Sequence, residues 1–487
     1  MDAQTVEQLK NTFGDRATTE EFELSFYQRD LAPIPGFLAK PLADTQPDII
    51  IRPQSVEEVA WVVKLANERG IAITTRAGGS TVYFNAVCTR KGIILDMNGI
   101  NSLATVDANN KVVRVGAGMP WWKLERQLNR LGLAACSYPS SAQSATIGGW
   151  LVMMGYGIGS LKYGSVREQV ISAQVVLPDG SVRQLDESSD PPVSWLAASE
   201  GTLGIVTEVE LKVRPYPETQ WHGLAAFQNA EQMQDFIEAA AALHNKPFNL
   251  HFSDPGCNSL RQRLELASPH TGEVYTVAFD DDGSKAETDE AGLAYKRCLQ
   301  AAKGRDLGSA EAEQEWQHRF YSLVLKREGP SLLGAEILLP INNLTDYLSK
   351  TAAFGSKQRM DFKSYGHIVS EKNVMIMTMF KADERDTIEY LQGLALVKKL
   401  HDIGAKFGGM PYGIGLWNTP YLNRCQTAKE LAELKRRKQL LDPKNIMNPG
   451  KRYGAPLLLK PAFFKAGMDL LAASRRVYRG KAGRNQL

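Results

Sequence analysis

The sequence predicts an α+β protein with more than one domain. Three observations support this fold class: a strand–helix–strand pattern over residues 47–76, a strand-rich block over residues 110–215, and helices that alternate with strands over residues 218–425. The chain has 487 residues, which is more than one hydrophobic core normally organises. We therefore expect two or three domains, with a boundary near the prolines at Pro215 and Pro217.

The strand–helix–strand pattern begins at Pro47 with "PDIIIRP", a short apolar run that is typical of a buried strand. Ser55 and Glu58 have the spacing of a capping box at the start of the following helix, and Gly70 stands where its last turn should close. The run "IAITTR" predicts a second strand. A helical crossover of this kind normally connects parallel strands.

The strand-rich block is organised by proline and glycine. It begins with "NKVVRVGAG" and continues through a helix that Pro120 opens and Gly132 ends. The stretch "VVLPDGSVRQL" has the composition of a hairpin, and "GTLGIVTEVELKVRP" alternates as a half-buried strand does. Beyond it, helical stretches such as "AEQMQDFIEAAAALH" alternate with strands such as "VYTVAFD", "LLGAEILLP" and "NVMIMTMF". This third region predicts an antiparallel sheet that helices cover on one face.

Composition excludes several classes of protein. A net charge of +3 gives no reason to expect a nucleic-acid partner. The five cysteines contain no C-x-x-C spacing, so neither an iron–sulfur cluster nor a structural zinc site is indicated. The first residues show no signal-peptide pattern, and no run of eighteen apolar residues occurs without a charge. We expect a reduced, cytoplasmic protein.

Three glycine-rich turns lie in the first 217 residues: "RAGGST" (76–81), "ATIGGW" (145–150) and "GYGIGS" (155–160). Successive backbone N–H groups in such turns can form a nest that binds a pyrophosphate without lysine. Taken singly, each could also be an ordinary turn. None has the G-x-G-x-x-G arrangement of a nicotinamide-binding fold.

The order and spacing of these turns resemble the FAD-dependent oxidoreductases of the vanillyl-alcohol oxidase and p-cresol methylhydroxylase (PCMH) superfamily. The similarity runs from about Pro47 to Tyr453 and is strongest in "IIIRPQSVEEVAWVVKLANERGIAITTRAGGST", "YPSSAQSATIGGWLVMMGYGIGSLKYGSVREQV", "ASEGTLGIVTEVELKV" and "LLDPKNIMNPGK". Within the superfamily, the chain is most similar to the branch of the glycolate oxidase flavin subunit, D-lactate dehydrogenase and D-2-hydroxyglutarate dehydrogenase.

The resemblance implies a two-lobed, PCMH-type FAD-binding domain and a ferredoxin-like antiparallel-sheet cap domain. The expected divisions are an N-terminal extension (1–46), the FAD domain (47–217), the cap or substrate domain (218–430), a C-terminal return to the FAD domain (431–455) and a basic amphipathic tail (456–487).

The resemblance also implies which residues contact FAD. The positions that match the family's flavin-contacting segments are Ala77, Gly78, Gly79, Ser80, Thr81, Pro139, Ser144, Thr146, Gly148, Gly149, Gly155, Tyr156, Gly204, Ile205, Asn448 and Lys451. Ser80 stands where some relatives carry a flavin-linking histidine, so we expect FAD to bind noncovalently. The chain departs from the family at Phe84 and Asn85, which replace a glycine pair, and at Met154, which replaces a common asparagine.

Three segments of the expected cap domain match the family's substrate site. Arg319 in "EWQHRFYSLVLK" matches an arginine that holds a substrate carboxylate in the family. The planar guanidinium of arginine suits this task, because it can form two parallel hydrogen bonds to a carboxylate. The alternative is that Arg319 is a surface residue of an amphipathic helix. His367 matches the first histidine of a metal-binding motif, but Met375 takes the place of the second. A buried structural histidine is therefore the alternative for His367.

The third segment, "GGMPYGIGLW" (408–417), lies where hydroxy-acid members have a metal-binding glutamate followed by a catalytic histidine. Pro411 and Tyr412 stand at those two positions, and Asn418 replaces a lysine. Because a thioether and a proline do not supply ligands for zinc or manganese, we expect no metal.

The expected reaction transfers hydride from a small carboxylate-bearing alcohol of the 2-hydroxy-acid type to flavin N5, while a base takes the hydroxyl proton. Two assignments remain open: Tyr412 as a substrate anchor with His367 as base, or Tyr412 as an activated phenolate. A phenol with a pKa near 10 would need about 4 kcal/mol of stabilisation from its surroundings to act at neutral pH.

Alternative functions are oxidation of a phenolic or other alcohol, and a flavin-bearing electron-transfer subunit of a larger complex. Electrons would pass to an iron–sulfur subunit, an electron-transfer flavoprotein or a quinone. In the tail, Phe463, Phe464, Met468, Leu470 and Leu471 fall within helical reach of one face and precede the basic residues Arg475, Arg476, Arg479, Lys481 and Arg484. This end could contact the inner face of the membrane or a partner protein, or could pack on its own domain.

Overall fold

The computed structural model describes residues 1–266, 273–320, 326–327 and 329–482, with side chains up to residue 475. The described chain forms two compact units, each assembled from segments that are distant in sequence. Unit 1 contains Met1–Tyr156, Ser165–Tyr216 and Gly413–Lys460. Unit 2 contains Gly157–Gly164, Pro217–Tyr412 and the chain from Pro461 onwards.

The boundaries of the units differ from the expected domain ends at 430 and 455. Residues 413–430 cluster with unit 1 because the N–H groups of Leu416 and Trp417 donate to the carbonyl of Tyr83, at 3.1 and 3.2 Å. The segment that closes unit 1 carries two helices, α15 (Leu422–Cys425) and α16 (Ala428–Leu441).

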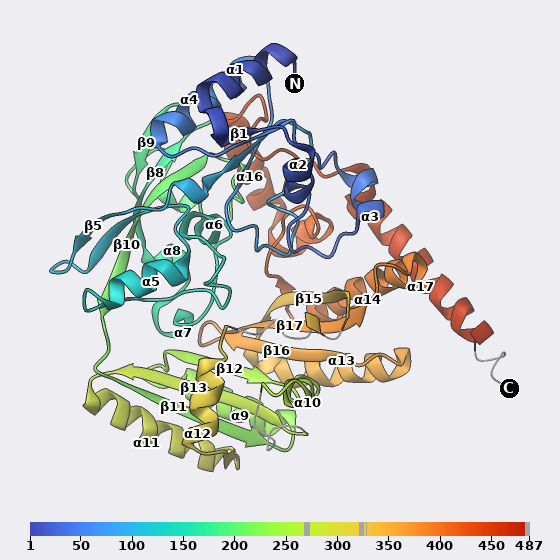
Figure 1. Cartoon of the computed structure of the whole chain (residues 1–487). Helices are drawn as coiled ribbons and strands as arrows, with labels where there is room; N and C mark the ends of the chain where they lie inside the picture. Colours follow the sequence, from blue (N-terminus) through green and yellow to red (C-terminus); the bar gives the residue numbers. More distant parts are fainter. Residues whose placement is uncertain (267–272, 321–325, 328, 483–487) are drawn as a thin grey trace. The chain divides into compact units, whose positions relative to one another are not determined.

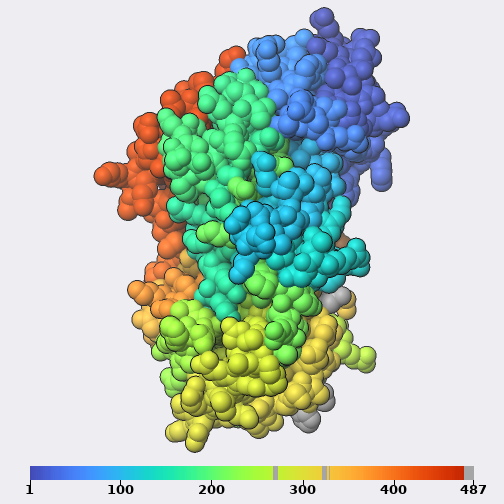
Figure 2. Space-filling view, turned by 90° about the vertical axis from the view of Figure 1, so that its left-hand side faces the viewer, coloured from blue at the N-terminus to red at the C-terminus, as the bar shows by residue number. Residues whose placement is uncertain are grey.

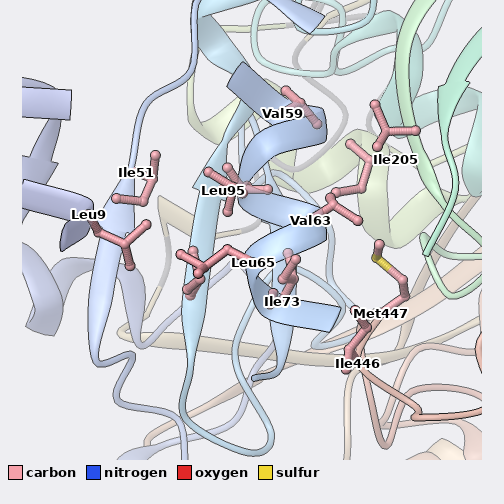
Figure 3. Close-up of a cluster of buried hydrophobic side chains, with 14 of the residues drawn as sticks. Leu9, Ile51, Val59, Val63, Leu65, Ile73, Leu95, Ile205, Ile446 and Met447 are labelled. Atoms are coloured by element: carbon pink, nitrogen blue, oxygen red, sulfur yellow. The ribbon is translucent and has the colours of Figure 1, made fainter. Parts of the chain in front are cut away.

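One layer of unit 1 is a four-stranded sheet in the order β1-β2-β4-β3. Its strands are β1 (Ala17–Thr18), β2 (Ile49–Ile51), β3 (Ile73–Arg76) and β4 (Ile93–Asp96). The expected crossover is present, but β2 and β3 do not pair directly, because β4 lies between them and is parallel to both. Helix α4 (Val56–Arg69) packs its apolar side against these strands, and the core that results is shown in Figure 3.

Helix α4 ends where the sequence predicts. The Ser55 hydroxyl accepts the N–H of Glu58 at 3.3 Å, and Gly70 closes the last turn in the left-handed region with φ = 65°. The reciprocal half of the capping box is absent, because the Glu58 carboxylate accepts instead from the Gln54 N–H and from Arg16. Ser55 therefore caps the helix alone.

The second layer of unit 1 is an antiparallel sheet in the order β5-β6-β10-β8-β9, with β7 paired to β10. Its strands are β5 (Leu103–Asp107), β6 (Val112–Gly116), β7 (Leu133–Ala135), β8 (Val170–Val176), β9 (Val182–Leu185) and β10 (Ile205–Pro215). Helices α5 (Trp121–Asn129), α6 (Ile147–Val152) and α8 (Val166–Gln169) connect them. The expected hairpin is β8–β9, and the expected alternating strand is β10.

Residues 1–46, the expected N-terminal extension, cluster with unit 1. They form α1 (Ala3–Phe13), β1, α2 (Glu21–Tyr27) and α3 (Gly36–Leu42). Leu9 of α1 lies in the same core as Ile205 of β10 and Ile446, which come from three distant parts of the chain (Figure 3). The Tyr27 hydroxyl donates to Asp96, and the dark-blue N-terminal residues lie directly against the lighter-blue residues that follow them (Figure 2).

Unit 2 is built on an eight-stranded sheet in the order β14-β11-β13-β12-β16-β17-β15-β18, in which every pair is antiparallel. The strands are β11 (Thr219–Phe227), β12 (Asn249–Ser253), β13 (Tyr275–Gly283), β14 (Arg305–Asp306), β15 (Ser331–Pro340), β16 (Lys363–Ile368), β17 (Asn373–Ala382) and β18 (Met410–Pro411). The predicted α+β class and antiparallel sheet are confirmed.

Helices cover both faces of this sheet, whereas the sequence indicated one. Helices α9 (Ala230–Ala241), α11 (Lys285–Ala301), α13 (Leu344–Gln358) and α14 (Thr387–Lys406) are on one side (Figure 1). Two shorter helices, α10 (Pro255–Arg263) and α12 (Ser309–Gln317), pack on the other; α7 (Ser160–Tyr163) belongs to the same unit. We call this second side the α10/α12 face.

The alternation of β15 shows which of its residues lie on the α10/α12 face. Ile337 is buried, and so is every second residue of β15 on either side of it. A Cβ added at Gly404 of α14 would lie 2.6 Å from the Ile337 side chain, so these buried residues face α14. Since successive side chains of a strand point to opposite faces, Leu332, Glu336 and Leu338 lie on the α10/α12 face. Leu332 accordingly packs against a cluster that contains Leu260 of α10.

The tail forms α17 (Pro461–Ala482), which packs on α14. Gln392 of α14 donates to the Ser474 hydroxyl at 3.3 Å, and Phe464 is buried. Phe463 and Leu470 are 54% and 72% exposed, so only part of the apolar face that the sequence predicts packs on its own unit. Arg484 lies outside the described residues, as do the side chains of residues 476–482. No helix in the described part of the chain is both long and apolar enough to cross a membrane.

Candidate functional site

The first predicted flavin segment is the loop that follows β3. Within the described residues, the backbone N–H groups of Gly78, Gly79, Ser80 and Thr81 make no hydrogen bond to the protein, and the four residues retain exposed surface. Gly79 has φ = 61°, a conformation that glycine adopts without strain. Four successive N–H groups that are left for a ligand form the kind of nest that binds an anion such as a pyrophosphate.

The second predicted segment contacts the first directly. A Cβ on Gly78 would overlap the carbonyl oxygen of Ser144, so the two loops touch through backbone alone. Thr146 precedes α6, and the N–H of Gly148 donates to the Ala117 carbonyl at 2.8 Å. A Cβ on Gly148 would approach Ala117 to 2.7 Å, so glycine at this position allows α6 to lie close to the sheet.

The other predicted positions around α6 are set by packing. Pro139 opens the turn in which the Ala142 N–H donates to its carbonyl at 3.0 Å. A Cβ on Gly155 would overlap the indole of Trp150, so this glycine allows the chain to leave α6. Tyr156 follows it, and burial raises the pKa of its phenol.

Gly204 precedes β10, and Ile205 is its first residue. A Cβ on Gly204 would approach the Val175 side chain to 2.9 Å, and the Ile205 side chain is buried in the core of unit 1 (Figure 3). Only the backbone of Ile205 can therefore make the predicted flavin contact.

Asn448 and Lys451 connect the C-terminal return to these loops. The Asn448 N–H donates to the Ile73 carbonyl at 2.7 Å, and its side-chain amide donates to the Glu200 carbonyl at 2.7 Å. Lys451 is 1% exposed and donates to the Val87 carbonyl; burial lowers its pKa to about 8. Both side chains are thus engaged by protein, and they fix the positions of the loops.

Glu200 is a central residue of unit 1 that the sequence did not indicate. Its carboxylate accepts from Asn85 at 2.9 Å and from the Gly415 N–H at 2.8 Å, and Arg452 lies 3.3 Å away. Burial raises its pKa, although Arg452 opposes the shift. This buried carboxylate joins the loop after β3, the segment before β10 and the C-terminal return.

Two of the positions where the chain departs from the expected family pattern have left-handed backbones. Phe84 has φ = 64° and Met154 has φ = 53°. A left-handed residue with a side chain costs roughly 1–2 kcal/mol relative to the right-handed conformation. The chain therefore keeps these conformations without the glycine or asparagine that would favour them.

On unit 2, Tyr412 lies next to the edge strand β18. Its N–H donates to the Glu336 carbonyl at 3.1 Å, which continues the β15–β18 pairing by one residue. Cross-strand register places Glu336 opposite Met377 of β17, and Met377 opposite Tyr365 of β16. These four residues form one row across the α10/α12 face.

His367 lies on the same face but in the next row. It pairs with Met375 of β17 and His251 of β12, and the two histidine rings are 5.5 Å apart. Three strand spacings, roughly 14 Å, separate the backbones of β16 and β18, so His367 and Tyr412 are not adjacent. His367 is 5% exposed, its Nδ1 makes no hydrogen bond in the described chain, and burial lowers its pKa to about 3.

Arg319 follows α12. Its guanidinium stacks on Trp316 at 4.1 Å and on Phe320 at 4.3 Å, and Nη1 donates to the Trp316 carbonyl at 2.8 Å. The Trp316 ring in turn stacks on His222 at 4.9 Å. These contacts fix the plane of the fork that the sequence predicts to hold a carboxylate.

A buried ion network that sequence reasoning missed supports α10 and α12. Glu315 of α12 accepts two hydrogen bonds from Arg261 of α10, at 2.8 and 2.6 Å, and lies 3.0 Å from Nε2 of His251. Although burial opposes the shift, Arg261 and His251 hold the pKa of Glu315 well below its usual range. The network ties both helices to β12.

Metal ligands were expected to be absent. Within the described residues, no group of three or more histidine, cysteine, aspartate or glutamate side chains has the arrangement of a metal site. Metal independence remains a prediction.

Comparisons with known proteins agree with this geometry. Residues 47–186 match the family model of the FAD binding domain, and residues 216–452 match that of the C-terminal domain of FAD linked oxidases. The two matches follow one another along the chain. Together they contain every predicted site residue except Gly204 and Ile205, which lie between them. The chain belongs to the FAD-linked oxidases. It is an FAD-dependent oxidoreductase.

Characterised relatives of this FAD-linked oxidase are similar over most of their length. It is 26% identical over 428 residues to a D-lactate dehydrogenase of Anaerostipes hadrus, which covers 83% of this chain and 89% of the relative. It is 24% identical over 429 residues to a glycolate oxidase subunit of Bacillus subtilis, with 85% and 91% covered. A solved structure of p-cresol methylhydroxylase with substrate bound superposes with a TM-score of 0.80 at 17% identity, over 92% of this chain and 96% of that one. The PCMH-type fold is confirmed.

The nest after β3 fits the cofactor of an FAD-linked oxidase, because unpaired N–H groups suit a pyrophosphate and the glycines keep side chains away. Gly78, Gly79, Ser80 and Thr81 would hold the pyrophosphate through their backbone. Noncovalent binding remains a prediction, based on Ser80 at the position where some relatives carry a flavin-linking histidine.

Proposed function

We propose that this FAD-linked oxidase oxidises a small alcohol that bears a carboxylate, of the 2-hydroxy-acid type, without a metal. The observation that carries the proposal is the similarity to a D-lactate dehydrogenase and a glycolate oxidase subunit over more than four fifths of the chain. The chemistry of Arg319 supports it, because a guanidinium in a fixed plane suits bidentate binding of a carboxylate.

The chain's own residues divide the work in this proposal. Arg319 binds the carboxylate and orients the substrate. Tyr412 is the alternative anchor: β18 lies six strand spacings from β11, whose His222 stacks on Trp316 beside Arg319, so a small substrate would contact either Arg319 or Tyr412. Bound FAD supplies the acceptor for the hydride. His367 is a poor base, because a group with a pKa of about 3 stays deprotonated but binds a proton only weakly at neutral pH.

Electrons must then leave the flavin, and we propose a separate iron–sulfur protein, an electron-transfer flavoprotein or a quinone as acceptor. One of the relatives is itself named as a subunit, which supports a protein partner.

Anaerobic bleaching of the flavin tests the substrate class. A panel of 2-hydroxy acids and a panel of phenolic alcohols are mixed with the purified holoenzyme, and the decrease of the flavin absorbance is followed. We expect reduction by a 2-hydroxy acid, unchanged after treatment with a chelator. Reduction by phenolic alcohols alone would favour the phenol-oxidising alternative. Reduction by neither panel would leave the electron-transfer subunit.

Arg319 variants test the carboxylate contact. Arg319→Met should weaken binding of the best 2-hydroxy acid roughly 100-fold, because a charge-assisted bidentate pair is lost. Arg319→Lys should restore only part of this affinity, since lysine has no planar fork. Equal affinity in all three proteins would show that Arg319 is an ordinary surface arginine.

A further inference from the structure

His222 of β11 lies on the α10/α12 face of the sheet, between β11 and the helix that precedes Arg319. Leu224 and Ala226 of the same strand pack in one cluster with Ala312 of α12. Since every second residue of a strand points to the same face, the His222 side chain points toward α12 as well. This side chain is 8% exposed, so it is largely enclosed between the sheet and the helix.

Asp280 of β13 fixes the orientation of the His222 ring. The two residues are directly opposed across the β11–β13 pair, and Nδ1 of His222 lies 2.8 Å from Oδ1 of Asp280. The second carboxylate oxygen accepts the side-chain amide of Asn249 at 2.7 Å. Because a carboxylate accepts hydrogen bonds, His222 donates from Nδ1. Its Nε2 lies 3.7 Å from Oε2 of Glu313, which is too far for a hydrogen bond.

The His222 ring supports the aromatic surface on which Arg319 lies. It stacks on the indole of Trp316 with 4.9 Å between the ring centroids and 24° between the planes. The guanidinium carbon of Arg319 is 4.1 Å from the centre of the same indole. Trp316 is 5% exposed, and Phe248 meets its ring edge-on at 6.3 Å. The indole is therefore held by buried neighbours, of which His222 is the one that stacks parallel to it.

The position of the Arg319 guanidinium depends on Trp316 in two ways. The guanidinium lies on the indole, and its Nη1 donates to the Trp316 carbonyl at 2.8 Å. A group that binds a ligand must be held within about 0.5 Å of its productive position by neighbours whose own rotamers are locked. A Trp316 ring that lost its support would therefore leave the guanidinium less well ordered, and more entropy would be lost when a carboxylate binds.

We propose that His222 is a positioning residue for carboxylate binding, because it holds Trp316 and, through Trp316, the guanidinium of Arg319. The proposal rests on the proposed function, since it needs Arg319 to bind the substrate carboxylate. In this role His222 contacts Trp316 and not the substrate. Loss of the role should weaken the binding of carboxylates without changing the chemistry of the alcohol group.

Two substitutions separate the ring of His222 from its hydrogen bond. His222→Asn keeps an N–H donor for Asp280 but removes the stacked ring. His222→Phe keeps a ring against Trp316 but removes the donor. We expect carboxylate binding to weaken roughly 3- to 30-fold in His222→Asn, the range in which an aromatic support contributes to a cation. His222→Phe should bind carboxylates with an affinity close to that of the wild type, and it should be the less stable of the two variants.

Calorimetric titration of the holoenzyme with propionate measures this affinity. Propionate carries the carboxylate but no hydroxyl group, so binding is measured without oxidation of an alcohol. Propionamide, its uncharged analogue, should not bind. His244→Asn is the matched control, because it makes the same replacement at an exposed histidine that follows α9, and it should bind propionate as the wild type does.

A double-variant cycle shows whether His222 acts through Arg319. In an Arg319→Met background, His222→Asn should cause no further loss of propionate binding. An additional loss of the same size in that background would overturn the proposal, because the effect would then reach the ligand by another route.

The outcomes distinguish this proposal from the proposed function. A His222→Asn holoenzyme that binds propionate as tightly as the wild type overturns the role of His222 and leaves the proposed function intact. If the wild type does not bind propionate, the carboxylate contact of Arg319 and the role of His222 both fail, whereas flavin reduction by a 2-hydroxy acid would still support the proposed oxidation. A loss of affinity in His222→Phe that equals the loss in His222→Asn shows that the stacked ring is not responsible, and it overturns the proposal.

Discussion

Gly78 and Ser144 touch through their backbones, at the point where the two predicted flavin loops meet. A Cβ at residue 78 would occupy the space of the Ser144 carbonyl oxygen. Because both contacting atoms belong to the main chain, neither can move aside by a change of rotamer. The shape of the nest after β3 therefore depends on glycine at this position.

Gly78→Ala should abolish or strongly reduce FAD binding. The methyl group would push the loop of residues 78–81 away from Ser144 and disorder the N–H groups of the nest. The ratio of flavin to protein absorbance in the purified variant measures the effect. Gly36→Ala, whose Cβ would meet only Arg29 at an ordinary 3.7 Å, should keep its flavin. Full flavin content in Gly78→Ala would mean that the loops separate without loss of the site.

Glu200→Gln should lower the free energy of unfolding by about 3–5 kcal/mol, because it leaves Arg452 buried without its countercharge. The two side chains are 2% and 7% exposed, so water cannot replace the lost partner. Chemical denaturation measures this loss. The double variant with Arg452→Met should be more stable than the sum of the two single effects predicts. Simple additivity would contradict a direct interaction.

Met154→Asn should stabilise the protein by about 0.5–1 kcal/mol, since asparagine tolerates the left-handed conformation that Met154 adopts. Thermal unfolding would show this as a small increase in melting temperature. Met154→Ala keeps a side chain with the same backbone cost, and it serves as the control that should not be stabilised. A gain in both variants would point to the removed methionine side chain and not to the backbone.

The buried His367 should make the fold sensitive to acid. Its pKa is lowered from 6.5 to about 3, so the unfolded chain binds a proton that the folded chain excludes. Stability is therefore complete above pH 6.5 and is lost as pH falls, by about 1.4 kcal/mol per unit. The slope of unfolding free energy between about pH 5 and pH 6.5 should be smaller in His367→Asn. Equal slopes would show that His367 is protonated in the folded protein.

Local signals in the sequence were sufficient for many elements. Ser55 and Gly70 mark the ends of α4, because caps depend on a few neighbouring residues. The alternation of β10 could also be read directly from the sequence. The predicted capping box failed because the Glu58 carboxylate had two possible partners. It accepts hydrogen bonds from Arg16, which is distant in sequence, and the capping box at Ser55 is incomplete.

The α17 helix shows the limit of reading an apolar face from composition. Phe463 and Phe464 are equally apolar, yet only Phe464 is buried, because the side of the helix that meets α14 is selected by packing. Neighbouring residues on a helix point about 100° apart, so a small rotation decides which of them contacts its partner.

The sequence by itself determined the fold family, and the resemblance to that family predicts the flavin loops and the candidates Arg319 and Tyr412, since short motifs carry the resemblance. The tertiary structure decided which groups meet. Glu200 carries no local signal in the sequence, and it became a central residue only because Asn85, Gly415 and Arg452 come together around it. The strand order of unit 2 separates His367 from Tyr412. Pairing between strands that are distant along the chain depends on the packing of the whole unit, and no short stretch of sequence records it.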